Sequence, residues 1–253
     1  MESDSRPRHF VGGYFLARTT ARPIWLPAQL PQPIVSASSC MVDMLPDLLE
    51  TPGWAGRKKS KWENRPGIEQ ARLQEMLLWV DEKLALHQIE WGSLFLSADI
   101  SKAFVALFGV STENLILIGI GLPEKYIPVF EENERSRSYG QDTGVNRMIR
   151  ARLPFESGGE LQGYEVLGWE MPNFHSWLCY GFYRYGYEKL GIRPNSHGFI
   201  ANLEEAERLA EYARRTDLPV LETVPTETQP WLPWLITRYP LGDEIRDALK
   251  PEP

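Results

Sequence analysis

The chain has 253 residues, of which 43% are hydrophobic and 24% charged, and it contains two cysteines. This composition is typical of a folded protein with a full apolar core and excludes a disordered or fibrous chain. The longest apolar run, residues 115–122, is far shorter than the roughly 20 residues that span a bilayer. The N-terminal segment lacks the apolar stretch of a secretory signal, and the two distant cysteines make no disulfide framework. We therefore expect a cytoplasmic protein with no membrane partner.

The formal net charge of −7 is unevenly distributed. Residues 1–65 contain 9 Lys or Arg against 6 Asp or Glu, whereas residues 66–253 contain 18 against 28. A general nucleic-acid binder neutralises phosphates with cations, so this acidic body argues against a nucleic-acid partner. The charge suits a basic protein partner instead.

The N-terminal part begins with a polar segment, residues 1–8, which we expect to be flexible. Residues 9–18 have the composition of a strand, and two adjacent glycines in it indicate a bulge. Four prolines in residues 19–33 exclude a helix and predict an extended surface segment. Residues 34–49 are compatible with a strand followed by a short helix.

Residues 57–61 include four basic side chains, and Trp54 and Trp62 lie close to them. Basic and aromatic residues together are typical of surfaces that track phosphates and stack bases. Short basic runs in loops bounded by Gly and Pro are more often solvated tips. A nucleic-acid accessory protein that uses residues 57–61 is therefore an alternative and not the main interpretation.

The middle of the chain alternates helices and strands. The apolar spacing predicts an amphipathic helix over residues 66–86. A strand over 92–98, a helix capped by Asp99 and ended by Gly109, and an uninterrupted apolar strand over 115–121 follow. We interpret the strand, helix and strand as a parallel crossover unit.

Two closely spaced glycines end this apolar strand, in the sequence GIGLP of residues 119–123. A phosphate-binding turn requires a third glycine at fixed spacing or a Gly-Lys-Ser sequence, and neither is present. The cysteines and histidines show no paired metal-ligand spacing. The sequence therefore predicts no cofactor and no metal.

The most loop-like stretch of the interior is residues 131–144, EENERSRSYGQDTG. We interpret it as an exposed contact loop, or as a subdomain junction within a single domain that spans residues 1–253. The partner-binding residues that we select are its acidic side chains, Glu131, Glu132 and Glu134.

Residues 145–155 have the pattern of a strand, along which lie Asn146, Arg147, Arg150 and Arg152. On the strand that follows, the acidic residues are Glu160, Glu165 and Glu170. Acids and arginines that face one another across two strands form cross-strand ion pairs of small energetic value. A charged pocket for an anionic ligand is the alternative interpretation.

Residues 163–191 have the densest apolar and aromatic content, and we expect the rest of the chain to pack around them. Residues 164–169 fit a strand that is apolar on both faces, and the pattern becomes helical after Asn173. On such a helix His175 and Cys179 are neighbours, because they are four residues apart.

This spacing supports a thiolate and imidazole pair, two ligands of a metal site, or a buried cysteine beside a histidine bonded to backbone. A catalytic cysteine needs an exposed, electropositive setting and a structural zinc site needs four ligands, so the buried cysteine is favoured and no catalytic residue is selected. A hydrolase-type enzyme remains the alternative. Its site would use His175 and Cys179, or carboxylates such as Asp43 and Glu165 that the fold brings together.

Towards the C-terminus, Asn202 followed by Glu205 predicts the start of a helix. Strands over 220–224 and 234–239 and a short helix over 243–250 complete the expected elements. Together these elements predict an α+β fold with a mixed, mainly antiparallel sheet and flanking helices.

Between residues 163 and 212 the chain contains in succession GYEVLGWE, FHSWLC, YEKLGI, GFI and LEEAERLAEY. This succession resembles a loosely defined set of uncharacterised bacterial proteins, some of which are immunity proteins that protect a cell from polymorphic toxins. The resemblance covers about fifty residues and specifies no catalytic residue. It implies a cytosolic, non-catalytic protein that neutralises a cognate toxin by binding a basic toxin domain.

Overall fold

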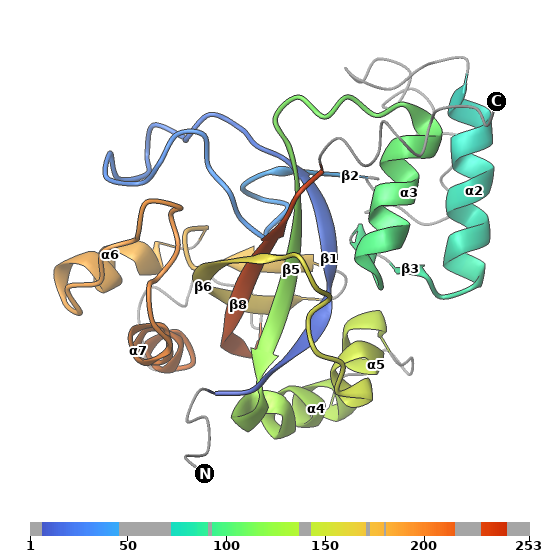
Figure 1. Ribbon diagram of the computed structural model, residues 1–253. Helices are drawn as coiled ribbons and strands as arrows, with labels where there is room; N and C mark the ends of the chain where they lie inside the picture. Colours follow the sequence, from blue (N-terminus) through green and yellow to red (C-terminus); the bar gives the residue numbers. More distant parts are fainter. Residues whose placement is uncertain are drawn as a thin grey trace, which may run out of the picture.

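A computed structural model of the chain is shown in Figure 1. The structure describes residues 7–45, 72–90, 93–136, 143–170, 173–179, 181–215 and 229–241. Outside the described residues lie the basic segment 57–61, the expected strand 220–224 and the expected helix 243–250.

The described strands are β1 (His9–Arg18), β2 (Asp43–Leu45), β3 (Ile89–Glu90), β4 (Leu94–Phe95), β5 (Leu115–Pro123), β6 (Glu160–Glu170), β7 (Asn173–Ser176) and β8 (Trp231–Tyr239). The described helices are α2 (Leu73–Ala85), α3 (Ala98–Phe108), the 3-10 turn η3 (Glu124–Tyr126), α4 (Ile127–Ser136), α5 (Gly144–Ala151), α6 (Phe182–Glu188) and α7 (Leu203–Ala213). None of the helices in the described ranges combines the length and apolar content that a membrane crossing demands.

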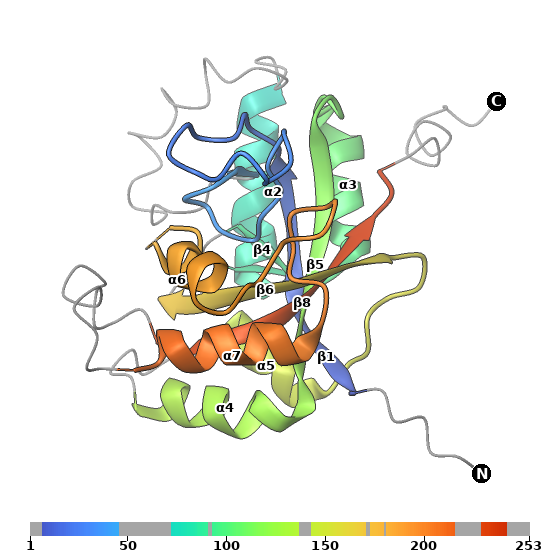
Figure 2. The same ribbon diagram turned by 90° about the vertical axis from the view of Figure 1, so that its left-hand side faces the viewer.

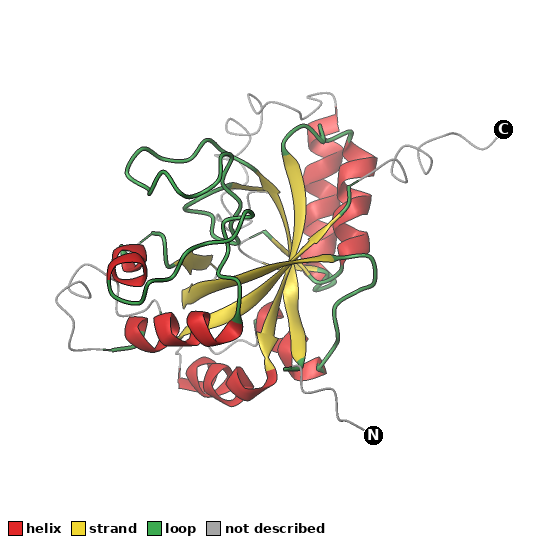
Figure 3. Cartoon of the chain, turned by 60° about the vertical axis from the view of Figure 1, so that its left-hand side comes forward, coloured by secondary structure: helices red, strands yellow, loops and turns green. Residues whose placement is uncertain are grey.

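The eight strands form one sheet in the order β3-β4-β1-β5-β8-β6-β7, with β2 added beside β1. Every pairing among the described strands is antiparallel. Figure 3 shows this sheet as a twisted centre with the helices around it. The predicted α+β fold with a mainly antiparallel sheet is therefore confirmed.

The sheet has a hydrophobic core on each of its two faces. The central strand β5 contributes to both cores, because its alternate side chains point to opposite faces. Ile116, Ile118 and Ile120 pack into one core together with side chains from α4, α6 and α7. Leu115 and Leu117 pack into the other core with side chains from α2 and α3. Figures 1 and 2 show α2 and α3 on one side of the sheet and α6 and α7 on the other.

The expected crossover of β4, α3 and β5 exists in a modified form. Both β4 and β5 run antiparallel to β1, so they point in the same direction. They do not pair with each other, because β1 lies between them in the sheet. The sequence indicates the direction of these strands correctly, but it does not reveal that the first strand of the chain separates them.

Several local signals are confirmed. The bulge predicted in β1 appears as a register shift between Val11 and Gly13. Gly109 ends α3 with φ 58, in the left-handed region that glycine tolerates. Asn202 Oδ1 accepts a hydrogen bond of 2.9 Å from Glu205 N and starts α7. The cap of α3 is Ser97, however, and not Asp99.

Two predicted conformations around α4 and α5 are wrong. Residues 131–136 continue α4, so this part of the expected loop 131–144 is helical. The expected strand 145–155 is largely α5, which Thr143 caps by accepting a hydrogen bond from Asn146 N at 3.2 Å. Val145, Met148 and Ile149 are its buried apolar residues, at the spacing of one helix face. The apolar residues of this segment do have helical spacing in the sequence, but the arginines between them make the spacing difficult to recognise.

The predicted helix after Asn173 is also wrong at its start. Residues 173–176 form β7, an edge strand paired with β6 through Glu170↔Asn173 and Gly168↔His175. The helix begins at Phe182, after Gly181 takes φ 77. The aromatic side chains of this stretch bury against the sheet, as in the contact of Phe174 with Trp169 at 4.6 Å between ring centroids. Tertiary burial therefore outweighs the local helical period.

The two glycines of β5 make room for aromatic side chains. A Cβ at Gly119 would lie 3.1 Å from the rings of Tyr14, Phe155 and Tyr239. A Cβ at Gly121 would lie 2.5 Å from Cε2 and Cζ of Phe155. These glycines lie inside a strand and not in a turn, so the structure gives the GIGLP sequence a packing role.

We expect Gly121→Ala to destabilise the protein by about 1–3 kcal/mol, because the added methyl group collides with the Phe155 ring. The next nearest atom, His9 Cβ, is 3.6 Å away and makes an ordinary contact. In a Phe155→Leu background the same change should cost much less. Denaturant unfolding of the two single variants and the double variant measures this coupling. Additive effects would contradict the packing role.

Candidate functional site

A buried carboxylate anchors the segment that carries Cys40. Glu165 lies in the middle of β6 with only 2% of its surface exposed. Ser36 Oγ donates a hydrogen bond of 2.6 Å to Glu165 Oε1, and Ala37 N donates one of 2.9 Å to Oε2. Ser176 of β7 also hydrogen-bonds to this carboxyl group. The irregular residues 36–38 are thereby fixed to the sheet.

The next residues form a single tight turn around Ser38. Met41 N and Val42 N both donate to Ser38 O, at 3.0 and 3.2 Å. The Ser38 hydroxyl accepts a hydrogen bond of 3.3 Å from Cys40 N. Ser38 is fully buried, whereas Cys40 is exposed. The turn therefore presents the Cys40 thiol at the surface from a buried base.

The hairpin of β6 and β7 brings a histidine and a carboxylate to this thiol. Cys40 Sγ lies 3.4 Å from His175 Nδ1. On the other side of the ring, His175 Nε2 lies 3.1 Å from Glu170 Oε2. The side chains of His175 and Glu170 are 14% and 28% exposed. Cys40, His175 and Glu170 thus form a continuous series of contacts, which we call the Cys-His-Glu cluster.

A second thiol completes the arrangement. Cys179 follows β7, and its N–H donates to Ser176 O at 2.8 Å. Its Sγ lies 3.5 Å from Ser38 Oγ, the same hydroxyl oxygen that accepts the hydrogen bond from Cys40 N. Cys179 is less exposed than Cys40, and both cysteines are free.

These contacts separate the proton affinities of the two thiols. The neighbouring Cys179 thiol, followed by the hydrogen bond with His175, lowers the pKa of Cys40 to about 4. The proximity of Cys40, together with burial, raises the pKa of Cys179. Cys40 is therefore the thiolate of the pair, and Cys179 keeps its proton.

The two neighbours of the histidine favour its protonated form. Burial lowers the pKa of His175, but the contacts with Cys40 and Glu170 outweigh burial and raise the pKa overall. In this state Nδ1–H donates to the thiolate and Nε2–H donates to the carboxylate. Both ring nitrogens are engaged, so the orientation of the ring is fixed.

The chemistry of such a cluster is nucleophilic. An exposed thiolate next to an imidazolium is an activated nucleophile, and the imidazole can transfer a proton to or from a reacting group. A third polar group that holds the imidazole in one orientation completes the general arrangement of nucleophile, base and orienting group. Here these roles fall to Cys40, His175 and Glu170.

The sequence singled out part of this site for the wrong reason. His175 and Cys179 were expected to be neighbours on one helix, but they lie on a strand and in the turn after it. The partner of His175 is Cys40, which is 135 residues away in the chain. No spacing signal links them, so only the residue types Cys, His and Glu pointed to this chemistry.

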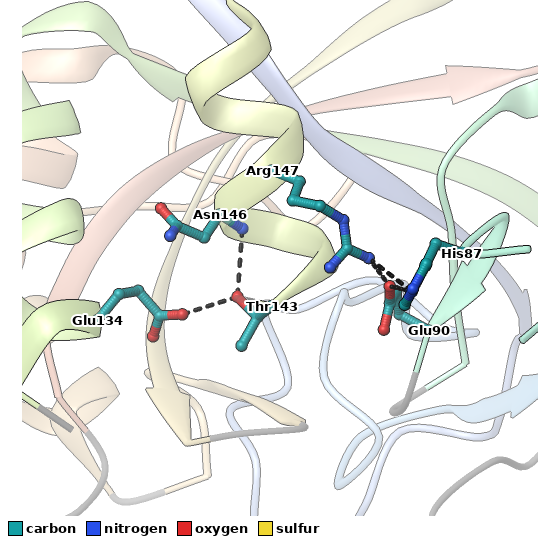
Figure 4. A network of polar contacts seen from close by, with 6 residues as sticks. All are labelled: His87, Glu90, Glu134, Thr143, Asn146 and Arg147. Atoms are coloured by element: carbon teal, nitrogen blue, oxygen red, sulfur yellow. Dashed lines mark hydrogen bonds and ion pairs between the residues drawn. The ribbon is translucent and has the colours of Figure 1, made fainter. Parts of the chain in front are cut away.

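The other predicted residues have different surroundings. Glu165 hydrogen-bonds to the segment that carries Cys40, and Asp43 stands opposite Arg18 in the pairing of β1 with β2. The predicted cross-strand pairs of arginines with Glu160, Glu165 and Glu170 do not fit α5, which is a helix. Arg147 instead forms an ion pair with Glu90 and contacts His87 Nδ1 at 3.4 Å (Figure 4).

The predicted partner-binding acids do not form one uniform surface. Glu132 is exposed and bonds to Arg135 at 2.6 Å, while Glu131 is half-buried. Glu134 uses both carboxylate oxygens, accepting 2.7 Å hydrogen bonds from Thr143 Oγ1 and from Trp169 Nε1. Figure 4 shows Glu134 directed towards Thr143, at the start of α5. The Glu134 carboxylate therefore connects α4 to α5 and β6.

Comparison with known proteins gives no further assignment: no family model, no curated protein and no solved structure matches the chain. Among the residues that the structure describes, no group of three or more His, Cys, Asp or Glu side chains is placed to hold a metal ion. The Cys-His-Glu cluster must therefore be interpreted from its own geometry.

Alkylation with iodoacetamide should show that Cys40 is a thiolate. We expect its rate constant to stay nearly constant from about pH 7 to 9, whereas an ordinary thiol, with a pKa of about 8.5, reacts more than tenfold faster at the upper limit. His175→Gln should introduce a rise with pH, because the thiolate loses its cationic partner. His197→Gln, which changes an exposed histidine outside the cluster, serves as the control. A steep profile for the unmodified protein would contradict this assignment.

Glu165→Gln should change how stability depends on pH. Burial raises the pKa of Glu165, so its contribution to stability is complete below the ordinary carboxyl pKa and is lost as pH rises through the raised value. The amide keeps an acceptor for Ala37 N and can donate to Ser36 Oγ. We expect the variant to gain stability relative to the wild type as pH increases from about 4 to neutrality. Chemical unfolding at several pH values measures this difference, and parallel stability curves would contradict it.

Proposed function

We propose that this protein is an enzyme that uses the Cys40 thiolate as the nucleophile for acyl transfer, with hydrolysis as the overall reaction. The single observation that carries the proposal is the geometry around His175. One ring nitrogen contacts an exposed cysteine, and the other contacts a carboxylate. A structural histidine needs no such pairing with a surface thiol, whereas nucleophilic catalysis requires it.

The steps follow from the positions of the three side chains. Cys40 Sγ attacks the carbonyl carbon of an ester, thioester or amide and forms a tetrahedral intermediate. His175 Nδ1–H donates its proton to the leaving group, which departs as the acyl thioester forms on Cys40. A water molecule then loses a proton to His175 and attacks the thioester, which releases the acid and restores the thiolate. Glu170 keeps the ring oriented and stabilises its positive charge.

A small activated ester, p-nitrophenyl acetate, tests this chemistry without knowledge of the natural substrate. We expect a burst of p-nitrophenolate and an acetyl group on Cys40 that mass spectrometry locates after rapid acid quenching. His175→Gln should slow acylation by about 10²–10⁴-fold, which is the usual contribution of general acid and base catalysis.

Two controls make the result specific. Cys40→Ser should lose the adduct, and Glu132→Gln should acylate at the wild-type rate because it alters an exposed carboxylate outside the cluster. Acylation of another residue, or equal rates in the wild type and His175→Gln, would overturn the proposed enzyme.

Toxin neutralisation by binding is a second candidate function. It is supported by the resemblance over residues 163–212, by the acidic charge of residues 66–253, and by an exposed apolar tip at Ile24 and Trp25. The two candidates differ in their dependence on Cys40. A non-catalytic immunity protein should retain a basic partner in equimolar amount when Cys40 is changed to Ser, and added salt should weaken the complex.

A further inference from the structure

The two cysteines of the chain meet at one place although they come from distant segments. Cys40 belongs to the turn around Ser38, and Cys179 follows the edge strand β7. Ser38 Oγ is 3.5 Å from Cys179 Sγ and accepts the N–H of Cys40 at 3.3 Å. Neither cysteine takes part in a disulfide bond. A chain with only two cysteines therefore places both beside the same hydroxyl group.

In the acyl-transfer reaction Cys179 lowers the pKa of Cys40 but neither attacks the substrate nor carries a proton. Cys40, His175 and Glu170 supply the nucleophile, the proton carrier and the orienting group. A neighbouring thiol is the usual companion of a different reaction, in which an accessible thiolate is oxidised and a second cysteine resolves the product. The exposure of the two residues fits these two roles: Cys40 is exposed, as the cysteine that is oxidised must be, and Cys179 is partly shielded.

We propose that Cys40 and Cys179 form a redox pair, in which a hydroperoxide oxidises Cys40 and Cys179 then closes a disulfide bond. This inference rests on the proposed function for the role of Cys40 as nucleophile, and it adds a second class of substrate at the same atom. The disulfide also removes the thiolate from His175, so the oxidised protein cannot perform acyl transfer.

Each step is balanced. The Cys40 thiolate attacks the distal oxygen of the hydroperoxide, the O–O bond breaks, and an alcohol or water leaves after taking one proton from His175. Cys40 is now a sulfenic acid, and the peroxide has been reduced by two electrons. The Cys179 sulfur then attacks Cys40 Sγ, the S–O bond breaks, and the thiol proton leaves with the hydroxyl group as water. A small dithiol reductant restores both thiols by exchange.

The surroundings of the pair favour closure of this bond. A disulfide needs its sulfur atoms about 2.05 Å apart. Cys40 N and Cys179 Sγ already adjoin the same Ser38 hydroxyl group, at 3.3 and 3.5 Å. The backbone on each side is held in place, by Glu165 on residues 36–37 and by the hydrogen bond of Cys179 N to Ser176 O.

The experiment treats the reduced full-length protein with one equivalent of hydrogen peroxide and then blocks free thiols with iodoacetamide. We expect non-reducing digestion and mass spectrometry to find a peptide pair linked through Cys40 and Cys179, which a phosphine reductant separates. Cys179→Ser should stop at the sulfenic acid, which dimedone traps on Cys40. Cys40→Ser should give neither product, and His197→Gln should behave as the wild type does.

The outcomes separate this inference from the proposed acyl transfer. If the wild type accumulates sulfinic acid on Cys40 with no link to Cys179, the redox pair is refuted, whatever p-nitrophenyl acetate shows. If the link forms but Cys40 is not acylated, the redox pair stands and the acyl-transfer proposal fails. If both reactions occur, peroxide treatment should abolish acylation and the phosphine should restore it. Acylation that persists in the fully linked protein would contradict the inference that the disulfide stops acyl transfer.

Discussion

The candidate site depends on one buried interaction, the hydrogen bonds between the Glu165 carboxyl group and the segment that precedes Cys40. Moving a carboxyl group from water into a protein core costs several kcal/mol when its polar atoms are left unpaired. Ser36, Ala37 and Ser176 offset this cost and are themselves fixed in the process. Residues 36–42 have little regular structure of their own, so this anchor decides where the Cys40 thiol lies.

The same hairpin supplies nearly all of the chemistry. β6 carries the anchor Glu165 and ends at Glu170, β7 carries His175, and Cys179 comes directly after it. The paired strands hold their own side chains at fixed positions. Because the sheet is rigid, it also fixes the reactive groups on the segments that connect its strands. Only Cys40 is brought from elsewhere, and it comes from the irregular segment between β1 and β2.

Their surroundings give the two cysteines different properties. Because Cys179 and His175 lower the pKa of Cys40, whereas Cys40 and burial raise the pKa of Cys179, negative charge is localised on the exposed sulfur. This polarisation serves attack on a carbonyl carbon and attack on a peroxide oxygen equally well, because both reactions require a thiolate. The geometry therefore connects a hydrolytic and an oxidative reaction through one atom.

The sequence by itself determined the elements whose signals are local. The apolar run of β5, the glycine after α3 and the Asn202 cap of α7 were predicted correctly, since each depends on neighbours in the chain. It did not reveal that residues 173–176 form an edge strand, because packing of Phe174 against Trp169 and Trp234 overrides the helical period there. Only the tertiary structure decided that Cys40 meets His175, since that contact spans 135 positions and is created by a buried carboxylate and a hairpin, neither of which leaves a periodic pattern in the sequence.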